Sequence, residues 1–155
     1  DYYEIYERSH SLTDRDAERL RTIIPFLEEQ IAHYKDFSAI TEEEYANDFM
    51  KRGAIERWVE NIMNAAIDIS KIILASEKHL VPQAYRESMK QAVWQLHLPD
   101  EYTSKFDQWV KIRNEFAYEY VDIKWKKILN FVKESELYVS EYVKASKQFL
   151  EQSGT

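Results

Sequence analysis

The side chains with the clearest capacity for chemistry lie close together near residue 115. Arg113 can hold a phosphate through two parallel hydrogen bonds, and the neighbouring Asn114 can orient a phosphate or a hydroxyl. Tyr118 and Tyr120 add two phenols to this cation and amide. Because an unperturbed phenol has a pKa of about 10, neither tyrosine is an effective general base at pH 7. The set is suited to binding a phosphodiester.

The arginine of this group lies on the apolar face of a predicted helix. That face consists of Phe106, Trp109, Val110, Arg113, Phe116, Ala117 and Tyr120. At about 100° of rotation per residue, Arg113 falls in line with the first and the last of them. Burying an unpaired guanidinium is costly, so two interpretations stay open. Either Arg113 forms a salt bridge with an acid of another helix, such as Asp68 or Glu60, or it faces a cleft and binds an anion.

The composition favours long helices joined by short connections. The 155 residues include only two glycines and three prolines, whereas sheets and their turns need more of both. Apolar periodicity predicts helices over residues 13–36, 42–76, 82–96, 100–120 and 122–152. Pro25 is expected to kink or split the first helix, and Gly53 to mark a bend in the second.

These elements predict an all-α fold, an antiparallel helical bundle of four to five helices. The length suggests a single domain over residues 1–155, with residues 1–12 as a less regular extension. The helix faces are wide and rich in aromatic side chains, so a homodimer that covers part of this surface is one interpretation, and a large aromatic core is the other.

Several classes of function are disfavoured. The absence of cysteine excludes disulfides and thiolate metal sites, and no two histidines have a metal-ligand spacing, so neither a metal nor a cofactor is expected. No apolar run approaches the roughly 20 residues that span a bilayer, and no secretory signal is visible. We therefore expect a cytoplasmic protein without a membrane contact.

The charge of the chain limits how it could contact RNA. The formal net charge is −7, whereas free-standing nucleic-acid binders usually carry a basic surface. RNA contact would then be limited to a small area around a few basic side chains. Lys124, Lys126 and Lys127 around Trp125 are candidates, although such a cluster is also typical of a solvated helix face.

The run from Arg113 to Tyr120, Arg-Asn-x-x-x-Tyr-x-Tyr, resembles the Arg-x4-His-x-Tyr motif of HepT-like proteins in the HEPN superfamily. Segments 54–57 and 65–69 look like the long second helix of that family, and segment 81–86 looks like the start of its third. The resemblance covers roughly residues 15–150. It implies a helical fold of the HEPN type.

The resemblance also implies a function. HepT-like proteins are small toxins that dimerise around a shared cleft and are described as metal-independent ribonucleases. Their partner is a minimal nucleotidyltransferase antitoxin, which can transfer AMP from ATP to the motif tyrosine. By position, Arg113 would be the phosphate ligand, Tyr120 the modifiable tyrosine and Asn114 the polar residue after the arginine. The implied partners are a second copy, the antitoxin and RNA.

One position departs from the family pattern. Tyr118 occupies the place of the motif histidine, and general acid–base help is worth about 10²–10⁴-fold in rate. Two functions therefore stay open: a toxin that binds and cleaves RNA, or a catalytically weakened module that binds RNA, or presents substrates to a nucleotidyltransferase, without cleaving RNA itself.

Overall fold

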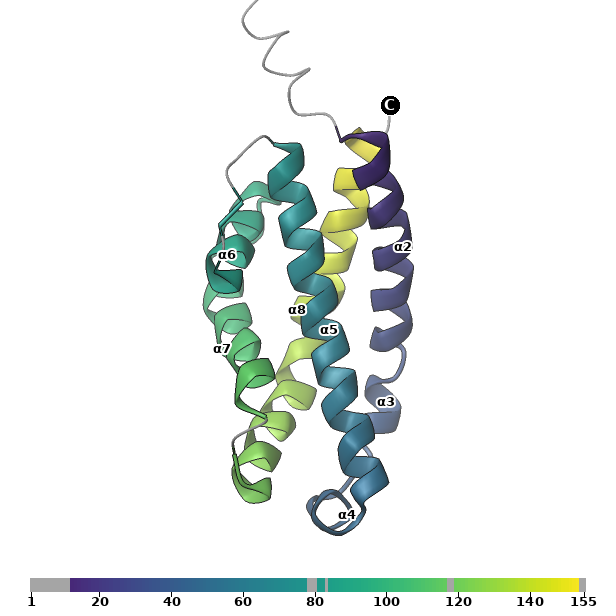
Figure 1. Cartoon of the computed structure of the whole chain (residues 1–155), viewed down its shortest axis with the longest axis vertical. Helices are drawn as coiled ribbons and strands as arrows, with labels where there is room; N and C mark the ends of the chain where they lie inside the picture. The colour runs from purple at the N-terminus through teal and green to yellow at the C-terminus, as the bar shows by residue number, and fades with distance from the viewer. Residues whose placement is uncertain (1–11, 78–80, 83, 117–118, 154–155) are drawn as a thin grey trace, which may run out of the picture.

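The structure is a computed structural model that describes residues 12–77, 81–82, 84–116 and 119–153. Within these ranges the chain forms helices and no strand, which confirms the predicted all-α class (Figure 1). The helices are α2 (Asp14–Ile31), α3 (Tyr34–Phe37), α4 (Glu42–Asn47), α5 (Phe49–Ser76), α6 (Tyr85–Gln95), α7 (Glu101–Glu115) and α8 (Val121–Ser153). The five longer ones, α2 and α5 to α8, correspond to the five predicted helices.

Helix α5 is the centre of the bundle. It packs against α2, α4, α6, α7 and α8, and Figure 1 shows it between α2 on one side and the α6–α7 pair on the other, with α8 crossing behind. One apolar stripe of this helix is buried throughout: Trp58, Ile62, Ala65, Ala66, Ile69, Ile72 and Ile73. Aromatic rings fill the space behind it, where Phe131 of α8 contacts both Trp58 and Trp109 edge to face.

The first two predicted helices are each divided in the structure. The 13–36 segment gives α2 and the short α3, and the division follows Ile31 rather than Pro25, which lies inside α2. The 42–76 segment gives α4 and α5, and the division lies at Asp48 rather than Gly53. Neither Pro25 nor Gly53 interrupts its helix.

The division at Asp48 has a local cause. Its backbone is extended, with φ −109° and ψ 100°, and its carboxylate accepts hydrogen bonds from the amides of Met50 and Lys51 at 3.0 and 3.1 Å. An N-cap of this kind begins a new helix because it satisfies amides that have no partner in the first turn. A capping box formed by Thr41 and Glu44 begins α4 in the same way.

The helix that carries the candidate site is shorter than predicted. Helix α7 ends at Glu115 instead of residue 120, and α6 begins at Tyr85 instead of residue 82. The apolar face of α7 is confirmed as far as it extends, since Phe106, Trp109, Val110 and Phe116 are buried. Tyr120 lies beyond the helix, so its predicted alignment with Arg113 along one helical face was wrong.

Some predictions concern residues that lie outside the part of the chain that the structure describes. The predicted irregular segment 1–12 lies there except for Leu12, and so does Tyr118. Asn114 belongs to α7, but its side chain is outside the described part of the structure. Among the helices that are described, none combines the length and hydrophobicity needed to cross a membrane.

Candidate functional site

Arg113 lies in the last turn of α7, between two buried neighbours. Ile112 and Phe116 anchor this turn in the core, while the Arg113 side chain is partly exposed. Its Nη1 donates a hydrogen bond to Oδ1 of Asn64 on α5, over 2.7 Å. This partner is a neutral amide rather than the carboxylate of Asp68 or Glu60 on the same helix. The hydrogen bond therefore orients the guanidinium.

A hollow of about 240 Å³ lies next to this hydrogen bond, between α2 and α5. It is lined by Thr22, Ile23, Phe26, Asn61, Asn64, Ala65 and Asp68. Asn64 is thus shared between the hollow and Arg113. Arg113 is consequently placed at a partly open surface of α5, rather than sealed in the core of the chain.

Tyr120 is strongly exposed, with 81% of its surface accessible. It lies immediately before α8, and its carbonyl oxygen accepts the amide hydrogen of Lys124 over 3.0 Å. The next residue, Val121, lines a hollow of about 310 Å³ between α4 and α8. The backbone of Tyr120 is therefore fixed at the start of a long helix while its side chain is open to solvent and to a modifying enzyme.

The three candidate RNA-binding lysines differ in their surroundings. Lys124 is only 17% exposed and forms an ion pair with Glu56 of α5 over 3.3 Å. Lys127 pairs with both Glu115 and Glu119. Burial alone would lower the pKa of Lys127, but the hydrogen bonds to these two carboxylates outweigh it and raise the pKa. Lys126 is exposed, so it is the member of the cluster best placed to reach a phosphate.

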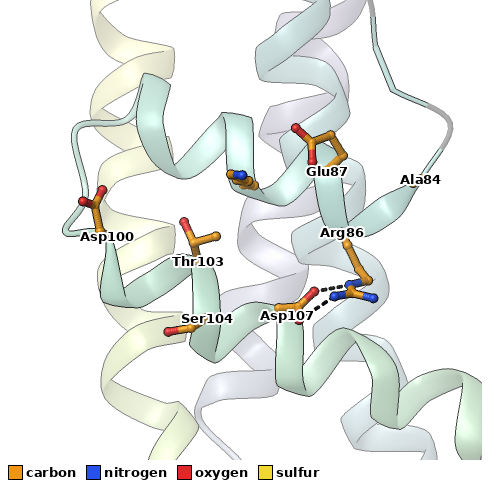
Figure 2. A pocket seen from close by; sticks show the side chains of 8 residues that line it. Ala84, Arg86, Glu87, Asp100, Thr103, Ser104 and Asp107 are labelled. Atoms are coloured by element: carbon orange, nitrogen blue, oxygen red, sulfur yellow. Dashed lines mark hydrogen bonds and ion pairs between the residues drawn. The ribbon is translucent and has the colours of Figure 1, made fainter.

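The largest described hollow, about 750 Å³, lies between α6 and α7 (Figure 2). Arg86 of α6 reaches across to Asp107 of α7 and donates hydrogen bonds to both carboxylate oxygens, the Nη2–Oδ2 pair at 2.9 Å. Glu87 and Asp100 add two more carboxylates, so Lys90 and Arg86 are the minority charges among the lining residues. A phosphate would meet a net negative wall here, and we do not assign the phosphate site to it.

Neither described histidine forms a hydrogen bond with Arg113. His97 is in the turn before α7, at the opposite end of that helix, with a positive φ of 58°. His33 is exposed and bonds Asp36 over 2.9 Å. Across the described residues, no three His, Asp or Glu side chains gather into a group that could hold a metal ion.

Asn64 is the site residue that sequence reasoning missed. It lies 49 positions before Arg113, and no motif connects the two. The available signal was its place on the outward face of a helix whose other faces are apolar. Only the packing of α7 against α5 shows that the amide meets the guanidinium.

Comparison with known proteins identifies the family of the chain. The profile of the family described as Ribonuclease HepT-like matches residues 27–146, so the chain belongs to the HepT-like family of the HEPN superfamily. Among solved structures, the fold is similar to the tri-AMPylated Shewanella oneidensis HEPN toxin in complex with MNT antitoxin. That match has a TM-score of 0.69 and 16% identity, and covers 83% of this chain and 96% of that chain. A comparison with curated proteins gives no match.

Proposed function

We propose that this chain is the toxin component of a toxin–antitoxin pair, an RNA-binding HepT-like protein that acts as a dimer. A minimal nucleotidyltransferase antitoxin would restrain it by adenylylating Tyr120. The family membership supports this proposal, and so does the similar HEPN toxin, which is itself AMPylated and bound to an MNT antitoxin. The observation that carries the RNA-binding part is the partly exposed Arg113, oriented by a neutral amide.

In this function Arg113 would hold an RNA phosphate by charge-assisted hydrogen bonds. A guanidinium already oriented by Asn64 loses less conformational freedom when the phosphate arrives, which favours binding. Lys126 would add a weaker, sequence-independent contact. The modification would join the phenol oxygen of Tyr120 to the α-phosphorus of ATP and release pyrophosphate, which adds bulk and a negative charge beside an RNA-binding surface.

The second candidate function is RNA binding without efficient cleavage. Tyr118 stands where the family motif has histidine, and neither described histidine forms a hydrogen bond with Arg113. A phenol can donate a hydrogen bond to a phosphate or a leaving oxygen, but it does not readily move a proton at neutral pH. In that case the chain would keep its fold and would still bind the antitoxin and RNA. It would inhibit the function of the RNA by binding it.

The proposal is tested by the affinity of Arg113→Ala for RNA. The probes are total tRNA and a fluorescein-labelled single-stranded RNA of mixed sequence, titrated at fixed ionic strength because phosphate contacts depend on salt. We expect affinity to fall about tenfold or more, since a hydrogen bond to a charged group is worth about 1.5–3 kcal/mol. The matched control is Lys111→Ala, a neighbouring cation on α7 that pairs with Asp107.

Thermal unfolding separates this result from loss of structure. Arg113 is partly exposed, so its removal should shift the free energy of unfolding by less than about 1 kcal/mol. Unchanged RNA affinity in Arg113→Ala, or equal loss in Lys111→Ala, would contradict the assignment. A collapse of stability would show that Arg113 serves the fold instead.

A further inference from the structure

Two large apolar side chains lie next to each other on the surface where α4 meets α5. Phe49 is 74% exposed and Met50 is 77% exposed, and both belong to the first turn of α5. We call these two residues the apolar corner. Neither side chain is needed to fill the core, so the feature calls for an explanation outside the packing of the chain.

The apolar corner is held in a fixed position by Arg52. The Nη1 of Arg52 donates hydrogen bonds to the carbonyl oxygens of Tyr45 and Ala46, over 3.1 and 3.0 Å. The same guanidinium lies over the Phe49 ring, 5.7 Å from its centroid. Because these contacts already exist in the free chain, a partner would have to order few further side chains, which favours its affinity.

A hollow lies directly beside the apolar corner. It is the hollow of about 310 Å³ between α4 and α8. Tyr45 and Ala46, whose carbonyls bind Arg52, line it from α4, and Val121 and Trp125 line it from α8. The apolar corner and the hollow therefore share the end of α4 and form one continuous surface.

The other side of the hollow carries Tyr120. This residue directly precedes Val121, and Ile123 in the first turn of α8 is 44% exposed. Figure 1 shows α4 and the start of α8 at the same end of the bundle. Single exposed apolar side chains are common, but several around one hollow are typical of an interaction site. One molecule that covers the hollow would therefore contact the apolar corner and lie over Tyr120.

The charges of the hollow indicate which kind of partner fits. Its charged lining residues are Glu42 and Asp122, both acids, and neither forms an ion pair within the described ranges. Glu43 adds an exposed carboxylate on α4. These groups repel the phosphates of RNA and attract a basic protein surface. Charge complementarity therefore favours a protein that carries basic side chains around an apolar centre.

We propose that the apolar corner and this hollow are the docking surface of the nucleotidyltransferase that modifies Tyr120, an extension that rests on the proposed function. The enzyme has to bring the α-phosphorus of its ATP to the phenol oxygen of Tyr120, so it has to cover the start of α8. Contacts at the apolar corner, remote from the reacting atoms, supply the binding energy that holds the two proteins in this position.

Binding without ATP tests the docking surface directly. The probe is the purified cognate minimal nucleotidyltransferase, and isothermal titration calorimetry gives its dissociation constant. In the double variant Phe49→Ser, Met50→Ser we expect affinity to fall about tenfold or more, because aromatic and methionine side chains are enriched at the centres of interfaces. The matched control is Leu137→Ser, at a residue that is 66% exposed and lies about 24 Å along α8 from Val121.

Charge reversal tests the acidic part of the surface. The double variant Glu42→Lys, Asp122→Lys should bind the enzyme about tenfold or more weakly, because two attractive contacts become repulsive. Affinity of the original chain should also fall as salt concentration rises, since salt screens these contacts. Glu136→Lys, at an exposed acid in the middle of α8, is the matched control and should leave affinity unchanged.

The kinetics of adenylylation separate docking from chemistry. In Phe49→Ser, Met50→Ser the KM for the chain should rise about tenfold or more, while kcat stays within about twofold, because the reacting phenol is untouched. A purely structural defect would instead lower the helical signal in circular dichroism. Both substituted side chains are exposed, so we expect that signal to be retained.

Several outcomes would overturn the docking surface. Unchanged enzyme affinity in Phe49→Ser, Met50→Ser would do so, and so would an original chain that does not bind the enzyme. If this variant instead loses RNA affinity or changes its oligomeric state while binding the enzyme normally, the apolar corner belongs to RNA or to a second copy.

The docking surface and the proposed modification fail separately. Tyr120→Phe should bind the enzyme as tightly as the original chain does. If docking depends on the apolar corner but Tyr120 receives no AMP, the docking surface stands and the modification is refuted. If Tyr120 is adenylylated with an unchanged KM in Phe49→Ser, Met50→Ser, the modification stands and the docking surface is refuted.

Discussion

The hydrogen bond from Arg113 to Asn64 shows how the type of a partner group affects a charged side chain. A carboxylate at the position of Asn64 would cancel the guanidinium charge and fix it as a structural ion pair. The amide of Asn64 instead accepts a hydrogen bond from the guanidinium and carries no charge of its own. This amide lies on another helix, 49 residues away in the sequence.

At the same scale, Tyr120→Phe should abolish adenylylation. The substitution removes the hydroxyl that we propose accepts AMP, and it leaves the exposed ring in place. The chain is incubated with ATP and its cognate minimal nucleotidyltransferase, and peptides are analysed by mass spectrometry. We expect the adenylyl mass on the peptide that contains Tyr120 of the original chain. Tyr138→Phe is the control, and an adduct that persists unchanged in Tyr120→Phe would refute the assignment.

Tyr118→His addresses catalysis. If the imidazole is the group that this chain lacks, the substitution supplies a proton donor and acceptor near neutral pH, and RNA cleavage should rise by about 10²–10⁴-fold. Cleavage of the labelled RNA is followed with a metal chelator present. The double variant Arg113→Ala, Tyr118→His serves as control and should be inactive. No gain with the single variant would count against proton transfer from this position.

At the scale of elements, the corner between α4 and α5 is set by a few short-range hydrogen bonds. At the start of α4, the side chains of Thr41 and Glu44 each accept a hydrogen bond from the backbone amide of the other residue. Asp48, the residue directly after α4, then caps α5. Lys51 then pairs with Glu44, and this contact raises the pKa of Lys51 and lowers that of Glu44. The corner holds Tyr45 against Trp125 of α8, so capping also determines where α8 begins to pack.

Asp48→Ala should therefore destabilise the fold. Loss of an N-cap typically costs about 0.5–2 kcal/mol, because two amides of the first turn lose their acceptor. Urea unfolding monitored by circular dichroism measures the change. Glu43→Ala, an exposed residue of α4, should change stability by less than about 0.5 kcal/mol. Asp48→Asn should retain most of the stability, and an equally large loss there would point away from capping.

The elements also show what the sequence could and could not predict. Apolar periodicity placed α8 within one residue at each end, since the apolar pattern depends on local spacing. It extended α7 to residue 120 because the apolar pattern continues there, although the helix ends at Glu115. Periodicity records which residues can face a core, but the end of a helix also depends on where the next element packs. The hydrogen bond between Arg113 and Asn64 is a tertiary contact, and no sequence motif connects the two residues.

At the scale of the whole molecule, buried hydroxyl pairs connect α8 to the rest of the bundle. Tyr142 of α8 bonds Ser70 of α5, and Tyr34 of α3 bonds Ser135 of α8 over 2.6 Å. All four side chains are buried. Burial raises the pKa of both phenols above the ordinary value, and the serine hydrogen bonds offset only part of this rise. Each tyrosine therefore stays protonated in the folded state at a pH that ionises it in the unfolded chain.

The free energy of unfolding should consequently fall in alkaline solution. The stability that these phenols contribute is fully present below the unfolded pKa of about 10, and it declines as pH rises towards the higher folded pKa. Each buried tyrosine should lower the free energy of unfolding by about 1.4 kcal/mol per pH unit in that window. Urea unfolding at about pH 8 and about pH 11 measures this loss.

Tyr142→Phe isolates one contribution. At neutral pH it should cost about 0.5–1.5 kcal/mol for the lost hydrogen bond, and its alkaline decline should be less steep than that of the original chain. Tyr120→Phe, at an exposed position, is the matched control and should leave the slope unchanged. An identical slope in Tyr142→Phe and the original chain would show that this phenol ionises freely in the folded state.

The carbonyl of Tyr120 supports the first turn of α8, while its ring stays in solvent. A nucleotide joined to that ring would displace no packed side chain, so the labelled molecules should resist proteases as well as the unlabelled ones do. Cells would then accumulate blocked copies instead of clearing them. Recovery of activity would have to wait for an enzyme that removes the label, or for dilution by newly made chains.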